Sequence, residues 1–171
     1  MRLKGAVMEL LERGDSDGLE RLVAAEPRAV QPLQGRLWDP DPDVRRLAAR
    51  ALGAAAAAHS ELGTELLRRA MWALNDESAT NGAPMLPMIG EIGYRAPELV
   101  APFVAPMASY LWDEGLRPGI LEALTRISEV APALVAEVRE QLLMIEPTSD
   151  SGEQACLDRL LAETREGGYG R

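Results

Sequence analysis

The sequence predicts an all-α protein, an α-solenoid of about five antiparallel helix pairs that repeat with a period of about 35 residues. Three observations favour this fold class. Alanine is very common, whereas aromatic residues make up only 4% of the chain, and this composition suits closely packed helices better than strands. Short proline-containing sequences, here called proline steps, recur along the chain: "AEPRAV", "RAPELV" and "VAPALV". Each step is followed by a polar break and a second helical pattern, as in a helical repeat.

The proline steps mark the first helix of each pair. Pro27, Pro97 and Pro132 lie 70 and 35 residues apart, and proline suits the first turn of a helix, where its missing N–H has no partner anyway. The missing member of the series falls at Leu62, and Ser60 is its expected N-cap. We therefore expect helices that begin near residues 27, 61, 97 and 132. Ten residues beyond Pro27, Leu62, Pro97 and Pro132, four residues share one register: Leu37, Trp72, Met107 and Leu142.

A second helix follows each polar break and is clearest after "WDPDPD". Asp41 is expected to cap this helix, with Pro42 in its first position and Asp43 near its positive end. The apolar face at helical spacing is Val44, Leu47, Ala48, Ala51 and Leu52. The corresponding faces of the later second helices are Met85, Ile89 and Ile92, then Leu116, Ile120, Ala123, Leu124 and Ile127.

The two ends of the repeat array are less regular than its middle. Residues 2–25 are expected to form a shorter helix pair that is broken at "RGDSDG". Terminal pairs of a solenoid act as caps and depart from the repeat pattern for that reason. Residues 1–166 are therefore expected to form one domain, and residues 167–171 a flexible Gly-rich tail.

The stretch "DPDPDVRRLAARALG" resembles the signature of HEAT-like repeats, in particular the short bacterial type found in phycobilin lyases. The matching residues are Asp41, Val44, Arg45, Ala48, Ala51, Leu52 and Gly53. The resemblance covers residues 39–57 and, less closely, 113–130, where "LRPGILEAL" follows. It implies a helical-repeat fold. It implies little about activity, because such repeats serve as scaffolds, enzyme subunits and chaperones alike.

Bulk properties narrow the classes of partner and compartment. The net charge of −9 repels phosphate backbones, so nucleic acid is not an expected partner. No uncharged apolar stretch approaches the ~20 residues of a membrane span, and "MRLKGAVMELLERGD" is expected to be an amphipathic helix and no signal peptide. A single cysteine excludes an internal disulfide and a cysteine-based zinc site. We expect a cytoplasmic protein without a cofactor, whose oligomeric state the sequence leaves open.

One run of acidic residues resembles a metal site but has a simpler interpretation. The alternation of Asp39, Asp41 and Asp43 suggests a calcium loop, but such a loop needs Gly at its sixth position and Glu at its twelfth. Val44 and Arg50 occupy those positions, so helix capping explains the acids better.

The histidine and the cysteine of the chain are weak candidates for catalysis. His59 lies at a turn between helices, where we expect it to face solvent, and Cys156 lies on a predicted helix face. Neither has the neighbours in sequence that would make it a convincing nucleophile or base.

Arginines and methionines in the repeats also have structural interpretations. Arg45 and Arg117 follow the first apolar residue of their helices, so we expect them to pair with loop acids of their own or the next repeat. Four methionines suit the filling of irregular core gaps, and the alternative is an adaptable binding surface: Met71, Met85, Met88 and Met107.

The loop over residues 75–83 is the best candidate site. It is longer than the corresponding loop before Asp41, and its polar residues are Asn75, Asp76, Glu77, Ser78 and Asn81. Three interpretations stay open: helix capping in a solvated loop, a protein-binding edge, and a metal or catalytic site. Loops within repeats line one edge of a solenoid, which would place five acids on one ridge: Asp39, Asp76, Glu77, Asp113 and Glu114.

Two hypotheses about function follow. The favoured hypothesis is a non-enzymatic protein–protein interaction or scaffold module that binds a protein partner of unknown identity through its concave face and this acidic ridge. The rival is a lyase-like or metal-dependent enzyme, or an enzyme subunit, that uses the 75–83 loop. Against the rival, the chain has no second histidine and no convincing Gly-rich phosphate loop. The sequence therefore assigns no catalytic residue and no metal ligand.

Overall fold

The computed structural model describes residues 2–76 and 82–166, and every regular element in these two ranges is a helix. The chain is therefore all-α, as its sequence predicts. Among the described residues, no helix combines the length and the hydropathy that crossing a bilayer requires.

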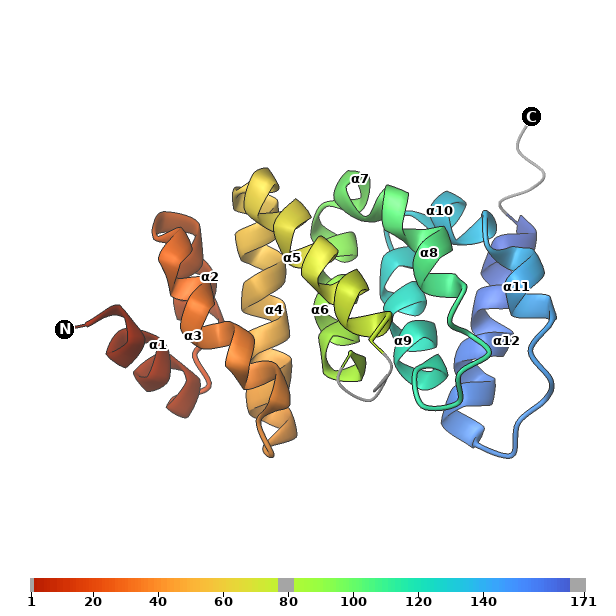
Figure 1. Cartoon of the computed structure of the whole chain (residues 1–171), viewed down its shortest axis with the longest axis horizontal. Coiled ribbons are helices and arrows are strands. Elements are labelled where there is room, and N and C mark those ends of the chain that lie inside the picture. Colours follow the sequence, from red (N-terminus) through yellow and green to blue (C-terminus); the bar gives the residue numbers. More distant parts are fainter. Residues whose placement is uncertain (1, 77–81, 167–171) are drawn as a thin grey trace.

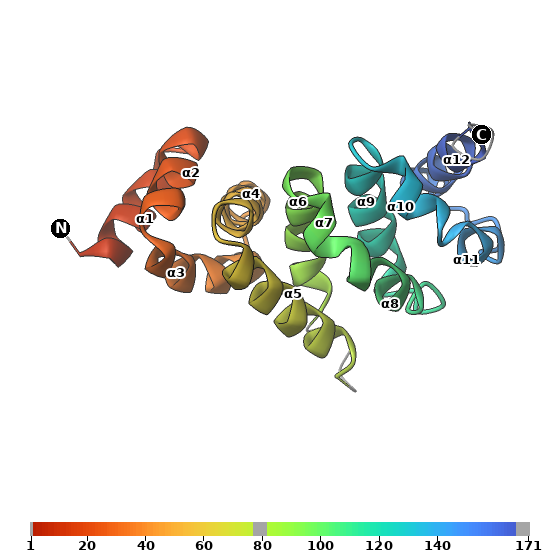
Figure 2. The same ribbon diagram turned by 90° about the horizontal axis from the view of Figure 1, so that it is seen from above.

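The helices form a row with two layers (Figures 1 and 2). One layer, here called the inner layer because the row curves toward it in Figure 2, contains α2 (Ser16–Ala25), α4 (Pro42–Ala58), α6 (Leu86–Arg95), α9 (Arg117–Ser128) and α12 (Ser151–Glu166). Consecutive members of this layer pack against each other. At the N-terminal end, α1 (Leu3–Glu12) packs against α2 and α4.

The outer layer consists of shorter pieces. Its first segment is the 3₁₀ turn η1 (Pro27–Ala29), α3 (Val30–Gln34) and the 3₁₀ turn η2 (Gly35–Trp38). The second segment is α5 (Ser60–Leu74). The third is α7 (Pro97–Val100), η5 (Ala101–Phe103) and α8 (Val104–Ala108), and the fourth is α10 (Pro132–Ala136) with α11 (Arg139–Leu143). The 3₁₀ turn η4 (Ala83–Met85) leads into α6.

The same backbone corner connects an inner helix to the next outer segment in four places. Glu26, His59, Ala96 and Ala131 have φ between −144° and −133° and each donates its N–H to the carbonyl four residues earlier. Three of them precede a proline, which disfavours the α region for the residue before it. The predicted helix starts are confirmed, because the outer segments begin at Pro27, Ser60, Pro97 and Pro132.

The register of α5 differs from the prediction by two residues. Ser60 is the first helical residue and His59 occupies the N-cap position, so the predicted cap at Ser60 is wrong. Counting from Ser60 places Ala70, not Trp72, in the core position that Leu37, Met107 and Leu142 occupy in the other segments. Ala70 is fully buried, whereas the Trp72 side chain is 79% exposed.

Prolines explain why two outer segments break into short pieces. Pro32 lies within α3, and Pro102 and Pro106 lie within η5 and α8. A proline inside a helix removes one i→i−4 hydrogen bond and clashes with the preceding turn, so the chain tightens into 3₁₀ geometry nearby. By contrast, α5 contains no proline and runs without interruption for 15 residues.

Glycines allow the inner helices to approach closely. A Cβ atom on Gly53 of α4 would lie 2.8 Å from the Cβ atom of Glu91 on α6, and one on Gly90 of α6 would lie 3.1 Å from the Cα atom of Ala123 on α9. The predicted core positions Leu52, Ile89 and Leu124 are fully buried beside these crossings, which confirms the predicted apolar faces.

Hydrogen bonds between neighbouring parts of the row reveal its period. Among the described residues, side-chain hydrogen bonds join five pairs that lie 35 positions apart: His59 with Ala24, Arg69 with Gln34, Tyr110 with Asn75, Arg126 with Glu91, and Ser128 with Glu163. The periodicity visible in the sequence is therefore also the spacing of side-chain contacts in space.

Candidate functional site

The first acids of the predicted ridge are held within their own loop. Asp39 accepts hydrogen bonds from the Asp41 N–H at 3.0 Å and from Arg36 at 3.1 Å. The backbone hydrogen bond, followed by the Arg36 guanidinium, lowers the pKa of the Asp39 carboxyl group. Asp41 caps α4 by accepting from the Asp43 N–H at 2.9 Å, as predicted. Capping therefore accounts for this acidic run, and Asp39 keeps its negative charge at the loop.

Arg45 stabilises the same loop in a way that the sequence did not predict. Its Nη1 atom donates to the backbone carbonyls of Asp39, at 2.6 Å, and of Pro40, at 3.1 Å. Among the described residues, Arg45 therefore contacts the loop through carbonyl oxygens and forms no ion pair with a carboxylate. Arg117 does pair with an acid of the next helix pair, because its Nε atom donates to the Glu153 carboxylate.

Of the 75–83 loop, the structure describes Asn75 and Asp76 at the start and Gly82 and Ala83 at the end. Asn75 ends α5, and its Oδ1 atom accepts a hydrogen bond from the Tyr110 hydroxyl at 2.9 Å. Asp76 is exposed. The predicted site residues Glu77, Ser78 and Asn81 lie outside the described residues. The contact between Asn75 and Tyr110 shows that the end of α5 lies beside the segment after α8.

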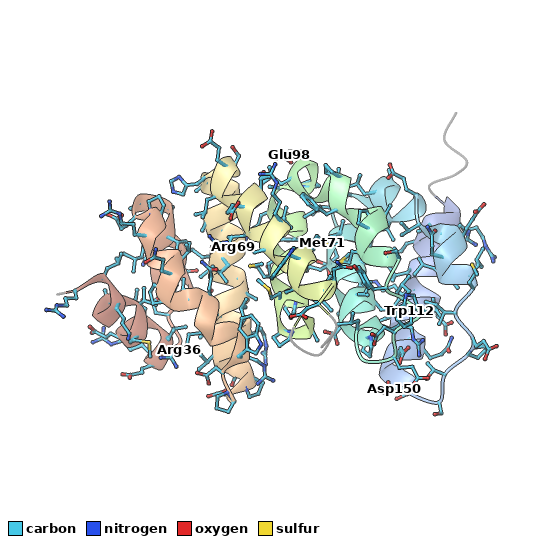
Figure 3. All side chains as sticks on the ribbon, in the orientation of Figure 1. Arg36, Arg69, Met71, Glu98, Trp112 and Asp150 are labelled. Carbon is cyan, nitrogen blue, oxygen red and sulfur yellow. The ribbon has the colours of Figure 1, made fainter. Side chains whose placement is uncertain are left out.

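That segment leads to a hollowed part of the surface. Asp113 folds the turn before α9, because its Oδ1 atom accepts from the N–H groups of Gly115 at 2.8 Å and Leu116 at 3.2 Å. Leu111 and Leu116 anchor the turn in the core. Trp112, between these anchors, points outward and is 74% exposed. Figure 3 shows Trp112 near the C-terminal end of the row.

The opposite wall comes from α11 and the chain that follows it. Leu142 is fully buried and anchors this wall, whereas Met144, two residues later, is 82% exposed. Asp150 caps α12 through the Glu153 N–H at 2.9 Å. Between the two walls lies a groove of about 730 Å³, here called the 108–149 groove. Its lining consists of Ala108, Ser109, Leu111, Trp112, Glu114, Arg117, Gln141, Met144, Ile145, Glu146, Pro147, Thr148 and Ser149.

The groove carries negative charge. The one basic residue among its described lining residues, Arg117, is paired with Glu153, whose side chain is only 8% exposed. Glu114 and Glu146 are exposed, and neither forms an ion pair with any described residue. Of the predicted site residues that the structure describes, Glu114 lines the groove.

Charges on the inner layer, in contrast, are largely matched within the chain. Arg126 of α9 pairs with Glu91 of α6 at 3.2 Å and with Glu129 at 2.6 Å, and its guanidinium carbon lies 3.4 Å from the centre of the Tyr94 ring. Burial alone lowers the pKa of Arg126, but the hydrogen bonds to Glu91 and Glu129 outweigh it and raise the pKa overall. These pairs hold adjacent inner helices together.

A second ion-pair cluster spans three inner helices. Glu20 of α2 binds Arg95 of α6 at 2.7 Å, across α4, and lies 3.6 Å from Arg50 of α4 itself. Both arginines therefore share one carboxylate. The Nε atom of Arg95 is buried and has no hydrogen-bond partner among the described residues.

The remaining candidates have structural surroundings. His59 is half-buried and its Nε2 atom lies 2.9 Å from the Ala24 carbonyl oxygen in an exposed contact, so the side chain faces solvent only in part. Cys156 is partly buried on α12. Met85, Met88 and Met107 are buried in the core, as the core-filling interpretation predicts, and Met71 is half-buried. In the two described ranges, no cluster of three or more His, Cys, Asp or Glu side chains could hold a metal ion.

Sequence reasoning missed the exposed aromatic residues. Trp38, Trp72 and Trp112 have exposed fractions of 46%, 79% and 74%. Tryptophan is highly buried on average, so exposure of all three is unusual. A signal was present, because "WD" occurs at Trp38 and again at Trp112, at the boundary between an outer segment and its polar break.

Comparison with known proteins adds no relative to these observations. No protein-family model matches the chain, and a search of curated proteins finds no match.

Proposed function

We propose that this chain is an α-solenoid of HEAT-like helix pairs and acts as a non-enzymatic protein-binding module. The two-layered row and the hydrogen bonds spaced by 35 residues support a repeat architecture, together with the resemblance over residues 39–57. In this proposal one outer and one inner helix form each antiparallel pair, and about five pairs stack.

The 108–149 groove is the observation that carries the binding function. Trp112 and Met144 expose large apolar side chains on its two walls, although the neighbouring Leu111 and Leu142 are buried. Tryptophan is enriched among the residues that dominate binding energy, and methionine adapts its shape to different partners. The groove has a volume of about 730 Å³, within the range of about 300–1,000 Å³ that is usual for small-molecule and cofactor pockets, so it has room for side chains of a partner.

The predicted acidic ridge becomes the border of this site in the proposal. Glu114 lines the groove itself, and Asp113 lies on the turn beside it. Asp39 and Asp76 lie on the equivalent loops of earlier pairs and extend the negative potential along the same edge (Figure 1). The inner layer contributes less to binding in this proposal, because its ion pairs already satisfy one another.

An affinity pull-down tests this function. We expect the wild type to enrich a protein from the lysate of its native host, and the Trp112→Ala, Met144→Ala double variant to lose it. Trp72→Ala is the matched control, since Trp72 is equally exposed but does not line the groove. A partner that the double variant retains would move the interface to the inner layer. An absence of enriched protein would contradict the binding-module proposal.

A further inference from the structure

We propose that the 108–149 groove binds an apolar peptide segment that carries arginine or lysine. This inference rests on the proposed binding function and adds the chemistry of the partner. Three features of the groove support it: the sign of its charge, the exposed indole ring, and the apolar side chains that each wall contributes.

The charge of the groove selects against acidic ligands. Glu114 and Glu146 supply two carboxylates from opposite walls, while the guanidinium of Arg117 is already engaged by the nearly buried Glu153. The whole chain has a net charge of −9, so the surrounding field has the same sign. A basic residue in the groove gains attraction from both carboxylates, and a phosphate or an acidic side chain is repelled.

Trp112 provides a surface on which a cation can stack. Its side chain is 74% exposed, and indole is the aromatic ring that attracts cations most strongly. The chain uses the same interaction internally, where the guanidinium carbon of Arg126 lies 3.4 Å from the centre of the Tyr94 ring. A basic side chain on Trp112 would also be close to Glu114, two residues along the same turn.

The other half of the site is apolar. Met144 and Ile145 form one wall with Pro147, and Leu111 lies below Trp112 on the other. The side chain of Gln141, at the edge, accepts and donates no hydrogen bond among the described residues and is therefore available to a peptide main chain. A partner that carried charge alone would leave this surface in water, so apolar residues are expected beside the basic one.

The experiment selects ligands without assuming a partner. A displayed library of short random peptides is panned against the purified full chain, and the enriched sequences are synthesised. Their binding is then followed by the fluorescence anisotropy of a dye-labelled peptide, which also serves for variants without Trp112. The fluorescence of Trp112 in a Trp38→Phe, Trp72→Phe variant, in which Trp112 is the sole tryptophan, reports separately on contact with the groove. We expect an enriched pattern in which arginine or lysine adjoins apolar residues, with affinity that weakens as salt rises.

Variants separate the two contributions. Trp112→Ala is expected to weaken binding at least tenfold, and the Glu114→Gln, Glu146→Gln double variant about tenfold, mainly for peptides that contain the basic residue. The matched control is Glu61→Gln with Glu98→Gln, which removes the same charge from exposed positions that do not line the groove. Figure 3 shows Glu98 at the opposite edge from Trp112.

The outcomes distinguish this inference from the proposed function. An acidic or uncharged pattern whose binding needs Trp112 would overturn the inference about charge and leave the groove as a binding site. Peptides that bind Trp112→Ala as well as the wild type would show that the groove is not the site. A concentration-dependent dimer that Trp112→Ala abolishes would assign the groove to a second copy of this chain. Failure to enrich any peptide would also overturn the inference, and the pull-down would then decide the broader function separately.

Discussion

Single side chains connect successive helices of this molecule through hydrogen bonds. Ser128 is one of the few buried polar residues of the described chain, and its hydroxyl oxygen lies 2.6 Å from the Glu163 carboxylate and 2.7 Å from the Thr125 carbonyl. The hydroxyl has one proton, and the ionised carboxylate is the stronger acceptor. The Ser128 hydroxyl, followed by the Arg159 guanidinium, lowers the pKa of Glu163 below its ordinary value of 4.5.

This shift predicts a dependence of stability on pH. Because the folded protein lowers the pKa of Glu163, the stabilisation is present above about pH 4.5 and is lost as pH falls through the folded pKa. Glu163→Gln should therefore destabilise the protein at pH 7, by less than about 1 kcal/mol because the side chain is partly exposed, and by less in acid. Urea unfolding at pH 7 and in acid measures both differences. Equal differences at the two pH values would contradict the assignment to Glu163.

At the scale of the element, prolines and glycines determine where helices start, break and touch. Helix starts were predictable because proline acts locally, through its own φ angle and the residue before it. The shift of α5 was not predictable in this way, because no proline marks its start: His59 occupies the corner, and its side chain contacts Ala24, 35 residues away. A displacement of two residues moved Trp72 out of the core, which the local pattern could not reveal.

The glycine contact between α4 and α6 can be tested directly. Gly53→Ala would place a Cβ atom 2.8 Å from the Glu91 Cβ atom and 2.9 Å from its carbonyl carbon. We expect a loss of about 1–2 kcal/mol in the free energy of unfolding, since overpacking outweighs the gain in helix propensity of about 1 kcal/mol. Gly35→Ala is the control, because no atom lies within 4 Å of its added Cβ, and it should be neutral or slightly stabilising. Equal effects of the two substitutions in urea unfolding would refute the packing argument.

The groove shows the same limit of sequence reasoning for the site. The sequence predicted acids along one edge, and Glu114 does line the groove. However, the opposite wall with Met144 comes from α11 and the chain that follows it, and no sequence motif links it to Trp112. Most of the predicted site residues that the structure describes have structural contacts. Asp113 stabilises a turn, and Asn75 binds Tyr110, which follows α8. A site formed by segments that are far apart in the sequence depends on how those segments pack. The period of the sequence indicates that packing only coarsely.

For the whole molecule, stability is expected to vary along the row. α6 packs against both α4 and α9, whereas α1 and α12 lie at the two ends and have neighbours on one side. In repeat architectures, each unit is stabilised mainly by its interfaces with adjacent units. The ion pair between Glu20 and Arg95 departs from this rule, because it joins two helices across a third.

Hydrogen exchange tests this expectation. The amides of α6 should exchange most slowly, and protection should decrease toward α1 and α12, because terminal units open at lower free energy. Glu20→Gln should increase exchange in α2 and α4 with little effect on α12, since the lost carboxylate binds arginines of α4 and α6. Uniform protection along the chain would show that the molecule unfolds as one cooperative unit.

The tie between Glu20 and Arg95 also has a mechanical meaning. A tensile load applied between the two ends of the row passes through each interface in series, so the weakest interface sets the yield force. Over α2, α4 and α6, the salt bridge carries part of that load in parallel with the packed interfaces. The described residues from α6 to α12 show no ion pair that skips a helix in this way. Under tension the interfaces between α6 and α12, which include the groove, would carry the load without such a salt bridge and are expected to separate before those from α2 to α6.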